Sequence, residues 1–346
     1  MKRFQNFNNP VALAMRLLAS KDRIAKFVLF REAIVAGLVP VDWVMTFFER
    51  IWIERMAQEH NLPLILILGG SRSGTTVLYQ VLAHSLPVSY LSNLNAIFPR
   101  STITARRLFA KFFREPEHSL ENFFGSVRGL NSPNDGFFLW NRWLGYDRGS
   151  VNTSIHPTDV AEATAFLDCW GSTFRTPLLN KNNRNLFAVP FFEKATRGRV
   201  VYVIIRRDPR YVVQSLIKSR KAIQGTVAKG WGLASKDSNL HHGSLAYVDD
   251  ICAQVWAVEK MLREVESCIE PKRVISIHYS DLCADPVRVV NLVSTKVFDR
   301  PAELQSVSWL SPLKSTDFRY ATFEEWNRLT YQLKQLYGES DFGQNK

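Results

Sequence analysis

The chain has 346 residues, of which 46% are hydrophobic and 12% aromatic, so it can bury a large core in one or two domains. Its formal net charge of +12 suits anionic ligands, polyanionic substrates or an acidic membrane surface. The sequence has no zinc-finger spacing, RNA-binding signature or long basic tail, so nucleic acid is the weakest candidate partner. Four cysteines without a CxxC motif predict a reducing cytoplasm and no metal site.

Residues 1–60 are expected to form an N-terminal helical cap. The stretch from Phe27 to Ile53 is strongly apolar, but charged residues and Pro40 leave no uncharged run long enough to span a membrane. We predict two amphipathic helices divided at Pro40 that pack on the rest of the chain. Contact with a membrane surface or with a partner is the alternative interpretation of this segment.

The next segment, LILILGGSRSGTTVLY, begins at Leu64 and combines a strand, a glycine turn and a helix. Five aliphatic residues from Leu64 to Leu68 are typical of a strand buried on both faces. Gly69 and Gly70 allow a sharp turn, and apolar residues at helical spacing follow the hydroxyl-rich loop. Backbone N–H groups at such a loop and helix start can bind an anion, so the segment predicts a phosphate-binding site.

The spacing of Gly69 and Gly74 matches a nucleotide-binding P-loop, but Thr75 stands where the Walker A motif requires lysine. The only cation inside the loop is Arg72. This difference argues against an ATPase or a kinase. An ordinary strand-to-helix connection is the alternative for the segment taken alone.

The sequence GSRSGTT before an apolar helix resembles the loop of sulfotransferases that use 3′-phosphoadenosine 5′-phosphosulfate (PAPS). In that family the loop holds the 5′-phosphosulfate, and Arg72 matches the family's loop cation, which is Lys or Arg. The resemblance implies a set of donor-binding residues, and these are Gly70, Ser71, Arg72, Ser73, Gly74, Thr75 and Thr76.

A second block supports the resemblance. Val200 to Ile205 has the composition of a buried strand, and it is followed by Arg207 and, eight residues later, by Ser215. A guanidinium at a strand end and a hydroxyl two turns into the following helix can close on one phosphate, which we expect to be the 3′-phosphate. The alternative is that the arginine pairs with Asp208 at the helix start.

Two weaker matches extend the resemblance over roughly residues 63–298, nearest to the bacterial-type and tyrosylprotein branches. LLNK, which ends at Lys181, corresponds to an Asn-Lys element of the tyrosylprotein branch. VISIHYSDL corresponds to a strand followed by a tyrosine that faces the nucleotide, so the resemblance implies that Tyr279 contacts the cofactor.

The catalytic base departs from the family pattern. The tyrosylprotein branch carries a glutamate where this chain reads SNLNAIFPR, and amides cannot accept a proton at neutral pH. Bacterial-type members carry an acidic pair after a proline, and the matching segment here is Pro133-Asn134-Asp135. Asp135 is therefore the first candidate for the base, with His84 second and His242 third. The alternative is that Asp135 only caps a turn or helix.

Other segments are expected to shape or cover the site. Residues 115–152 are rich in aromatics and turn formers, as in a loop that walls a substrate cleft, and residues 222–244 resemble a mobile flap. Residues 105–113 place apolar and basic side chains on opposite faces of an expected helix. This segment either has a face that is simply exposed to solvent or binds the acceptor or a lipid. Further helices are expected over residues 161–174, 247–268, 285–298 and 323–337, and residues 339–346 form a polar tail.

We predict one α/β domain over residues 61–338, with a P-loop-like three-layer fold and a central, mostly parallel sheet flanked by helices. The resemblance implies a PAPS-dependent sulfotransferase in which Arg72 and Lys181 stabilise charge on the leaving group and Asp135 accepts the proton. No metal is expected, because a sulfuryl group carries less charge than a γ-phosphoryl group.

A P-loop phosphotransferase and a catalytically inactive nucleotide-binding protein of the same fold are the alternatives. The acceptor, a hydroxyl or amine compound, stays open between carbohydrate, lipid, peptide tyrosine and small metabolite. The oligomeric state stays open as well.

Overall fold

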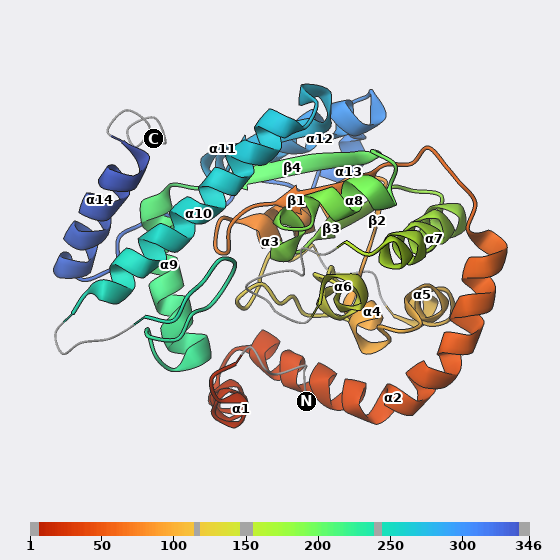
Figure 1. The fold of residues 1–346 in the computed structure, drawn as a ribbon, viewed down its shortest axis with the longest axis horizontal. Helices are drawn as coiled ribbons and strands as arrows, with labels where there is room; N and C mark the ends of the chain where they lie inside the picture. Colours follow the sequence, from red (N-terminus) through yellow and green to blue (C-terminus); the bar gives the residue numbers. More distant parts are fainter. Residues whose placement is uncertain (1–6, 114–117, 146–154, 239–243, 339–346) are drawn as a thin grey trace.

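A computed structural model describes residues 7–113, 118–145, 155–238 and 244–338 of the chain (Figure 1). Five parallel strands form one sheet in the order β2-β3-β1-β4-β5. The strands are β1 (Leu64–Leu68), β2 (Ser89–Tyr90), β3 (Leu178–Lys181), β4 (Val200–Arg206) and β5 (Val274–His278). The predicted α/β fold with a parallel sheet is therefore confirmed, and β1 has the expected bounds.

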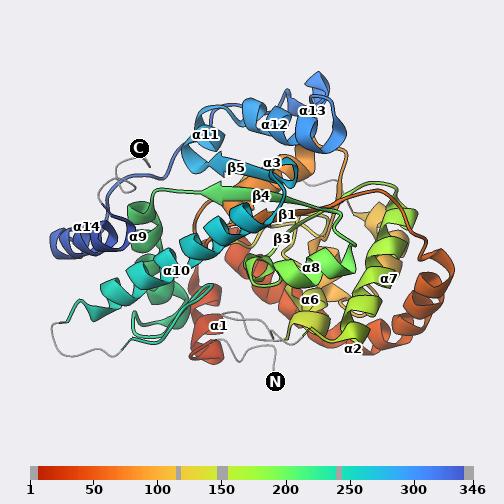
Figure 2. The same ribbon diagram turned by 45° about the horizontal axis from the view of Figure 1, so that its top comes forward.

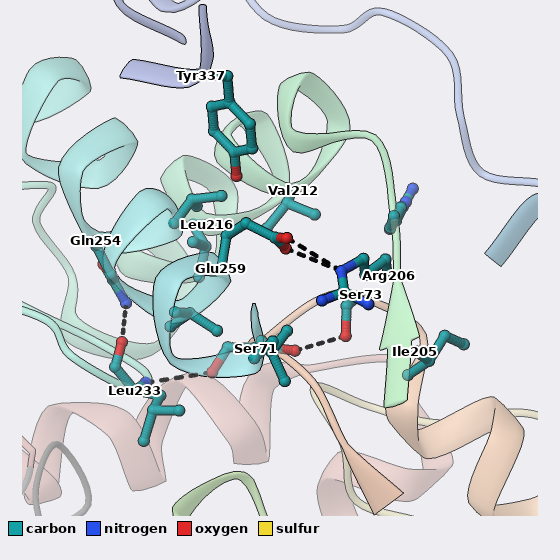
Figure 3. Close-up of a pocket in the computed structure, with 15 residues that line it drawn as sticks. Ser71, Ser73, Ile205, Arg206, Val212, Leu216, Leu233, Gln254, Glu259 and Tyr337 are labelled. Atoms are coloured by element: carbon teal, nitrogen blue, oxygen red, sulfur yellow. Dashed lines mark hydrogen bonds and ion pairs between the residues drawn. The ribbon is translucent and has the colours of Figure 1, made fainter. Parts of the chain in front are cut away.

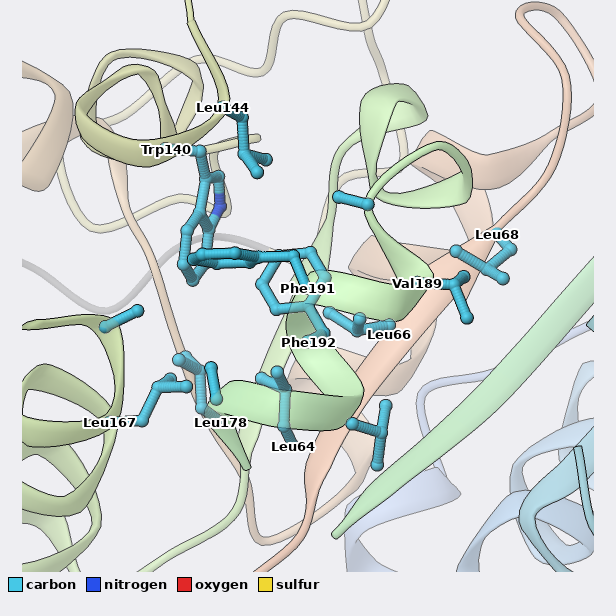
Figure 4. Packing of buried hydrophobic residues seen from close by; sticks show 14 of the residues in the cluster. Leu64, Leu66, Leu68, Trp140, Leu144, Leu167, Leu178, Val189, Phe191 and Phe192 are labelled. Atoms are coloured by element: carbon cyan, nitrogen blue, oxygen red, sulfur yellow. The ribbon is translucent and has the colours of Figure 1, made fainter. Parts of the chain in front are cut away.

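Both faces of the sheet are covered, which explains why the strands are continuously apolar. Leu64, Leu66 and Leu68 point into one core, and Ile65 and Ile67 point into another. The first core is closed by α6 (Phe137–Leu144), α7 (Pro157–Phe174), α8 (Val189–Ala195) and α10 (Ala246–Cys268) (Figure 4). The second is closed by α3 (Thr75–Ser85), α11 (Tyr279–Ala284), α12 (Pro286–Phe298) and α13 (Leu304–Val307). The result is the expected three-layer arrangement (Figure 2).

The N-terminal segment differs from the prediction. After α1 (Pro10–Ala19), one continuous helix, α2 (Arg23–Met56), passes through Pro40, so the division into two helices at this proline was wrong. Pro40 removes the backbone hydrogen bond to the Ala36 carbonyl, but both residues are exposed and water can satisfy that oxygen. Val35 and Met45, on either side of the proline, are buried in one cluster, so packing holds both halves on the body. Figure 1 shows α2 curving around the molecule.

The inward face of α2 is unusually polar. Asp42 accepts hydrogen bonds from the backbone N–H (3.1 Å) and the hydroxyl (2.6 Å) of Ser101. Glu49 accepts from the N–H groups of Ile103 (3.0 Å) and Thr104 (2.8 Å), in the first turn of α5 (Thr102–Phe109). Both carboxylates are almost fully buried. They satisfy donors of α5 that have no partner within the helix, and they complement its dipole.

Further helices complete the fold. The bounds are α4 (Asn93–Ile97), α9 (Pro209–Ser219), α14 (Phe323–Tyr337), the 3₁₀ helices η2 (Ala110–Phe112), η3 (Asn183–Leu186) and η5 (Pro271–Arg273), and the π-helix η4 (Arg220–Gln224). Residues of α9, α10 and α14 share a third core, and α14 has the predicted bounds. Among the helices described, none is long and apolar enough to cross a membrane. The predicted polar tail 339–346 lies outside the described residues.

Candidate active site

The loop between β1 and α3 is tightly packed against the ends of neighbouring strands. Gly74 has a φ of +98°, and a Cβ on it would lie 2.5 Å from the ring of Tyr279. A Cβ on Gly69 would lie 2.8 Å from the Ile205 carbonyl oxygen. Both positions therefore require glycine. Gly74 is also the N-cap of α3 and offers no side-chain cap, so the first-turn N–H groups of that helix can bind an anion.

Arg72 and Ser215 meet in the structure. The Nε of Arg72 donates a hydrogen bond to Ser215 Oγ at 3.0 Å, and its guanidinium lies over the Phe124 ring at 5.4 Å. Arg207 in turn donates from Nη1 to the Arg72 carbonyl at 3.0 Å. Burial, and then the nearby Arg207 charge, lower the pKa of Arg72. The charge of Arg207 acts on Arg72, and two neighbouring cations favour the binding of an anion.

Other donors of Arg207 bind residues in the C-terminal part of the chain. Asp317 lies 2.6 Å from its guanidinium, and Thr316 Oγ accepts at 3.0 Å. The guanidinium also lies 4.6 Å from the centre of the Tyr279 ring, whose hydroxyl is 3.3 Å from Thr316. Sequence reasoning missed Asp317, which lies in an extended segment without a motif of its own.

Arg206 and Asp208 have structural roles beside this junction. Arg206 pairs with Glu259 (3.1 Å) and Glu266 (2.8 Å) of α10, and Figure 3 shows its ion pair with Glu259. Asp208 pairs with Arg210 at the start of α9, and not with Arg207 as in the alternative interpretation. The cavity in Figure 3 has a volume of about 40 Å3, which is too small for a nucleotide.

Lys181 and Asp135 form an ion pair next to the loop. Lys181 ends β3, its side chain is only 4% exposed, and its Nζ lies 3.2 Å from the Asp135 carboxylate, which is 37% exposed. The Asp135 carbonyl accepts from the side chains of Asn180 and Asn182 at 3.3 Å each, so the segment is tied to β3. The Asp135 carboxylate is therefore partly exposed, whereas the Lys181 side chain with which it pairs is buried.

A cavity of about 460 Å3 connects the loop to this ion pair. Ser71, Lys181 and Asp135 all line it. A Cβ on Gly125 would lie 3.6 Å from Thr76 Oγ1 and 3.9 Å from Lys181 Nζ, so the segment around Gly125 covers their junction. Aromatic side chains form much of the wall, and they are Phe7, Phe124, Phe137, Phe138 and Trp231.

The expected flap, residues 222–244, begins in η4, and its residues 225–238 form another wall of this cavity without a helix or strand. The Gln254 side chain donates to the carbonyls of Trp231 (3.0 Å) and Leu233 (2.8 Å). The segment approaches the loop closely, because a Cβ on Gly232 would lie 2.7 Å from Ser71 Oγ. These contacts close the cavity over the loop.

Of the alternative bases, His84 does not line this cavity. His84 lies in the last turn of α3, beside His118 and Trp309, and lines a different cavity. Burial, and then His118, lower the pKa of His84 to about 4. His242 lies outside the described residues. In the described ranges, no cluster of three His, Cys, Asp or Glu residues is arranged to hold a metal ion.

Two amides of the segment SNLNAIFPR, Asn93 and Asn95, have structural roles. Asn93 Oδ1 accepts hydrogen bonds from Arg31 (2.7 Å) and Asn134 (2.8 Å). Ser92 and Asn95 form a capping box at the start of α4. Asn93 therefore links the inward face of α2 to the segment that carries Asp135.

Comparisons with known proteins agree with this architecture. The chain is similar over 97% of its length to sulfotransferase STF9 from Mycobacterium avium, of which it covers 97%, with a TM-score of 0.59 and 12% identity. It is similar over 95% of its length to sulfotransferase STF1 from Mycobacterium tuberculosis, of which it covers 90%, with a TM-score of 0.55 and 12% identity. No curated protein sequence matches the chain.

At these identities, the structural likeness shows a shared fold. The sequence model described as "Sulfotransferase family" matches residues 63–295, which is more than half of the chain and includes the loop, Lys181 and Arg207. The chain therefore belongs to the sulfotransferase family.

Proposed function

We propose that this sulfotransferase uses PAPS as its donor and transfers the sulfuryl group to a hydroxyl or amine compound bound in the 460 Å3 cavity. The observation that carries the proposal is the junction of Arg72, Ser215 and Arg207, which brings two cations and the start of α3 together. PAPS supplies a sulfuryl group on a phosphate leaving group. The loop residues 70–76 and Tyr279 would hold its phosphosulfate and nucleotide parts.

In the proposed reaction, an S–O bond forms to a hydroxyl acceptor, or an S–N bond to an amine acceptor, while the S–O bond to the donor phosphate breaks. The acceptor's proton passes to a carboxylate oxygen of Asp135, which lies at the cavity wall. Arg72 and Lys181 stabilise the negative charge that develops on the leaving phosphate. Lys181 also contacts Asp135, so the same cation orients the base.

The donor is tested by incubating the full chain with ³⁵S-labelled PAPS and a panel of alcohols, phenols and amines. We expect transfer of label to at least one acceptor class. Parallel reactions with γ-labelled ATP and Mg²⁺ test phosphoryl transfer, which we expect to be absent because Thr75 replaces the Walker lysine. Phosphoryl transfer without sulfuryl transfer would contradict the proposal.

Arg207→Ala tests the 3′-phosphate site. We expect weaker binding of 3′-phosphoadenosine 5′-phosphate by about 2 kcal/mol or more, because a charge-assisted contact is lost. Calorimetry should show a much smaller loss for adenosine 5′-phosphosulfate, which has no 3′-phosphate. An equal loss for both nucleotides would assign Arg207 a structural role only.

Asp317→Asn is the matched control for this variant. The Asp317 carboxylate is 2.6 Å from Arg207 and would have to leave when a phosphate binds there. Neutralising it should raise the affinity for the 3′-phosphorylated nucleotide, or leave it unchanged, while Arg207→Ala lowers it. Weaker binding by Asp317→Asn would mean that the pair holds the site in shape.

The proposal includes a cytoplasmic location for the protein. All four cysteines are free thiols, and three of them are buried. This supports a reducing, cytoplasmic location.

A further inference from the structure

The outward faces of α1 and α2 carry large apolar side chains. On α2, Phe30, Val41, Trp43, Val44, Phe47 and Phe48 are between 41% and 66% exposed. On α1, Val11, Met15 and Leu18 follow one another at helical spacing, and each is at least 60% exposed. We call these nine residues the outer apolar face. Scattered apolar residues are common on protein surfaces, but contiguous ones mark an interaction site.

The inward side of α2 differs from that of an ordinary surface helix, because it buries charged side chains beside the apolar Val35 and Met45. Arg31, Asp42 and Glu49 lie on the inward side and are 8% exposed or less. Their hydrogen bonds to Asn93, Ser101 and the start of α5 hold that side against the body. The apolar side is therefore held outward by specific polar contacts.

Basic side chains flank the outer apolar face. Among the exposed charged residues of α2, four are basic and one is acidic, namely Arg23, Lys26, Arg50, Arg55 and Glu54. Lys26 lies one helical turn before Phe30, and Arg50 lies one turn after Phe47. The guanidinium of exposed Arg100 lies 5.1 Å from the centre of the Trp43 ring. The face thus combines aromatic rings with positive charge.

We propose that the outer apolar face docks on the surface of an anionic lipid bilayer. Aromatic and aliphatic side chains beside Lys and Arg are the composition of helices that lie in the membrane interface. A second copy of the chain fits less well, because a two-fold contact would bring the same basic residues face to face. The docked helix also borders the 460 Å3 cavity, whose wall includes Phe7 and Arg31.

Vesicle co-sedimentation of the full chain tests this proposal independently of catalysis. We expect binding to vesicles of phosphatidylcholine with phosphatidylglycerol, and much weaker binding to phosphatidylcholine alone. The first variant is Phe47→Ser/Phe48→Ser, which should lower the partition coefficient about tenfold or more, since two exposed aromatic rings no longer enter the interface. Phe323→Ser on α14 is the matched control, because Phe323 is 67% exposed and Phe47 is 64% exposed. The control should bind as the unmodified protein does.

A second variant, Lys26→Gln/Arg50→Gln, removes two positive charges. It should lose mainly the electrostatic part of the vesicle binding, which high salt also weakens. Circular dichroism and thermal unfolding check that each variant is folded. Absence of binding by the unmodified protein, or equal binding by Phe47→Ser/Phe48→Ser and Phe323→Ser, would overturn the proposal. A dimer seen by analytical ultracentrifugation and lost in Phe47→Ser/Phe48→Ser would overturn it too, and would identify a second copy as the occupant.

Discussion

Asp135→Asn is expected to lower turnover with an alcohol acceptor by about 10²- to 10⁴-fold, the usual contribution of a positioned base. The amide has nearly the same shape as the carboxylate but cannot accept the proton. PAPS affinity should change little, because the loop, Arg207 and Ser215 are untouched. Steady-state kinetics and calorimetry of the same preparations measure the two quantities. A phenol acceptor, which is more acidic, should show a smaller loss than an alcohol.

Asp237→Asn is the control for this experiment. Asp237 lines the same cavity and pairs with Lys229 at 2.7 Å, so this variant also removes one carboxylate from the cavity wall. We expect near-normal turnover, because Asp237 is not beside Lys181. If Asp135→Asn retained normal turnover with an alcohol, Asp135 would be excluded as the base and its pair with Lys181 would be structural.

Arg72→Ala is expected to weaken donor binding and to lower turnover as well, by about 10²- to 10³-fold for the loss of one charge-stabilising donor. Both effects are expected because the guanidinium would contact the donor before and during transfer. Single-turnover rates at saturating PAPS separate the chemical step from binding. Loss of the Ser215 hydrogen bond and of the Phe124 contact contributes to the effect on binding.

Arg72→Lys separates charge from geometry. Lysine keeps the positive charge but lacks the guanidinium fork that reaches Ser215. We expect it to recover much of the turnover lost in Arg72→Ala. Full activity of Arg72→Ala at saturating donor would show that the side chain only helps to fold the loop. Thermal unfolding of both variants shows whether the left-handed backbone at residue 72, with φ of +73°, tolerates the change.

The elements that sequence reasoning placed best have a strong local signal. A run of aliphatic residues before two glycines gave the bounds of β1, and helical periodicity gave those of α14. The helix break predicted at Pro40 was wrong, because the effect of a proline on a helix also depends on how other residues of that helix are buried. Local rules predict a break at a proline, but they do not include the packing of Val35 and Met45 that keeps the helix in one piece.

The sequence by itself determined three of the five strands, β1, β4 and β5, and also the anion-binding loop with Arg72 and the arginine after β4, because each depends on neighbours within a few residues. Only the tertiary structure showed that Arg72 donates a hydrogen bond to Ser215. It also showed that Arg207 forms an ion pair with Asp317 and that Lys181 forms one with Asp135. These partners lie far apart in the chain and are brought together by the order of the parallel strands and by the loops that cover their ends. Such contacts have no periodic pattern or spacing in the sequence, so local reasoning has no signal from which to predict them.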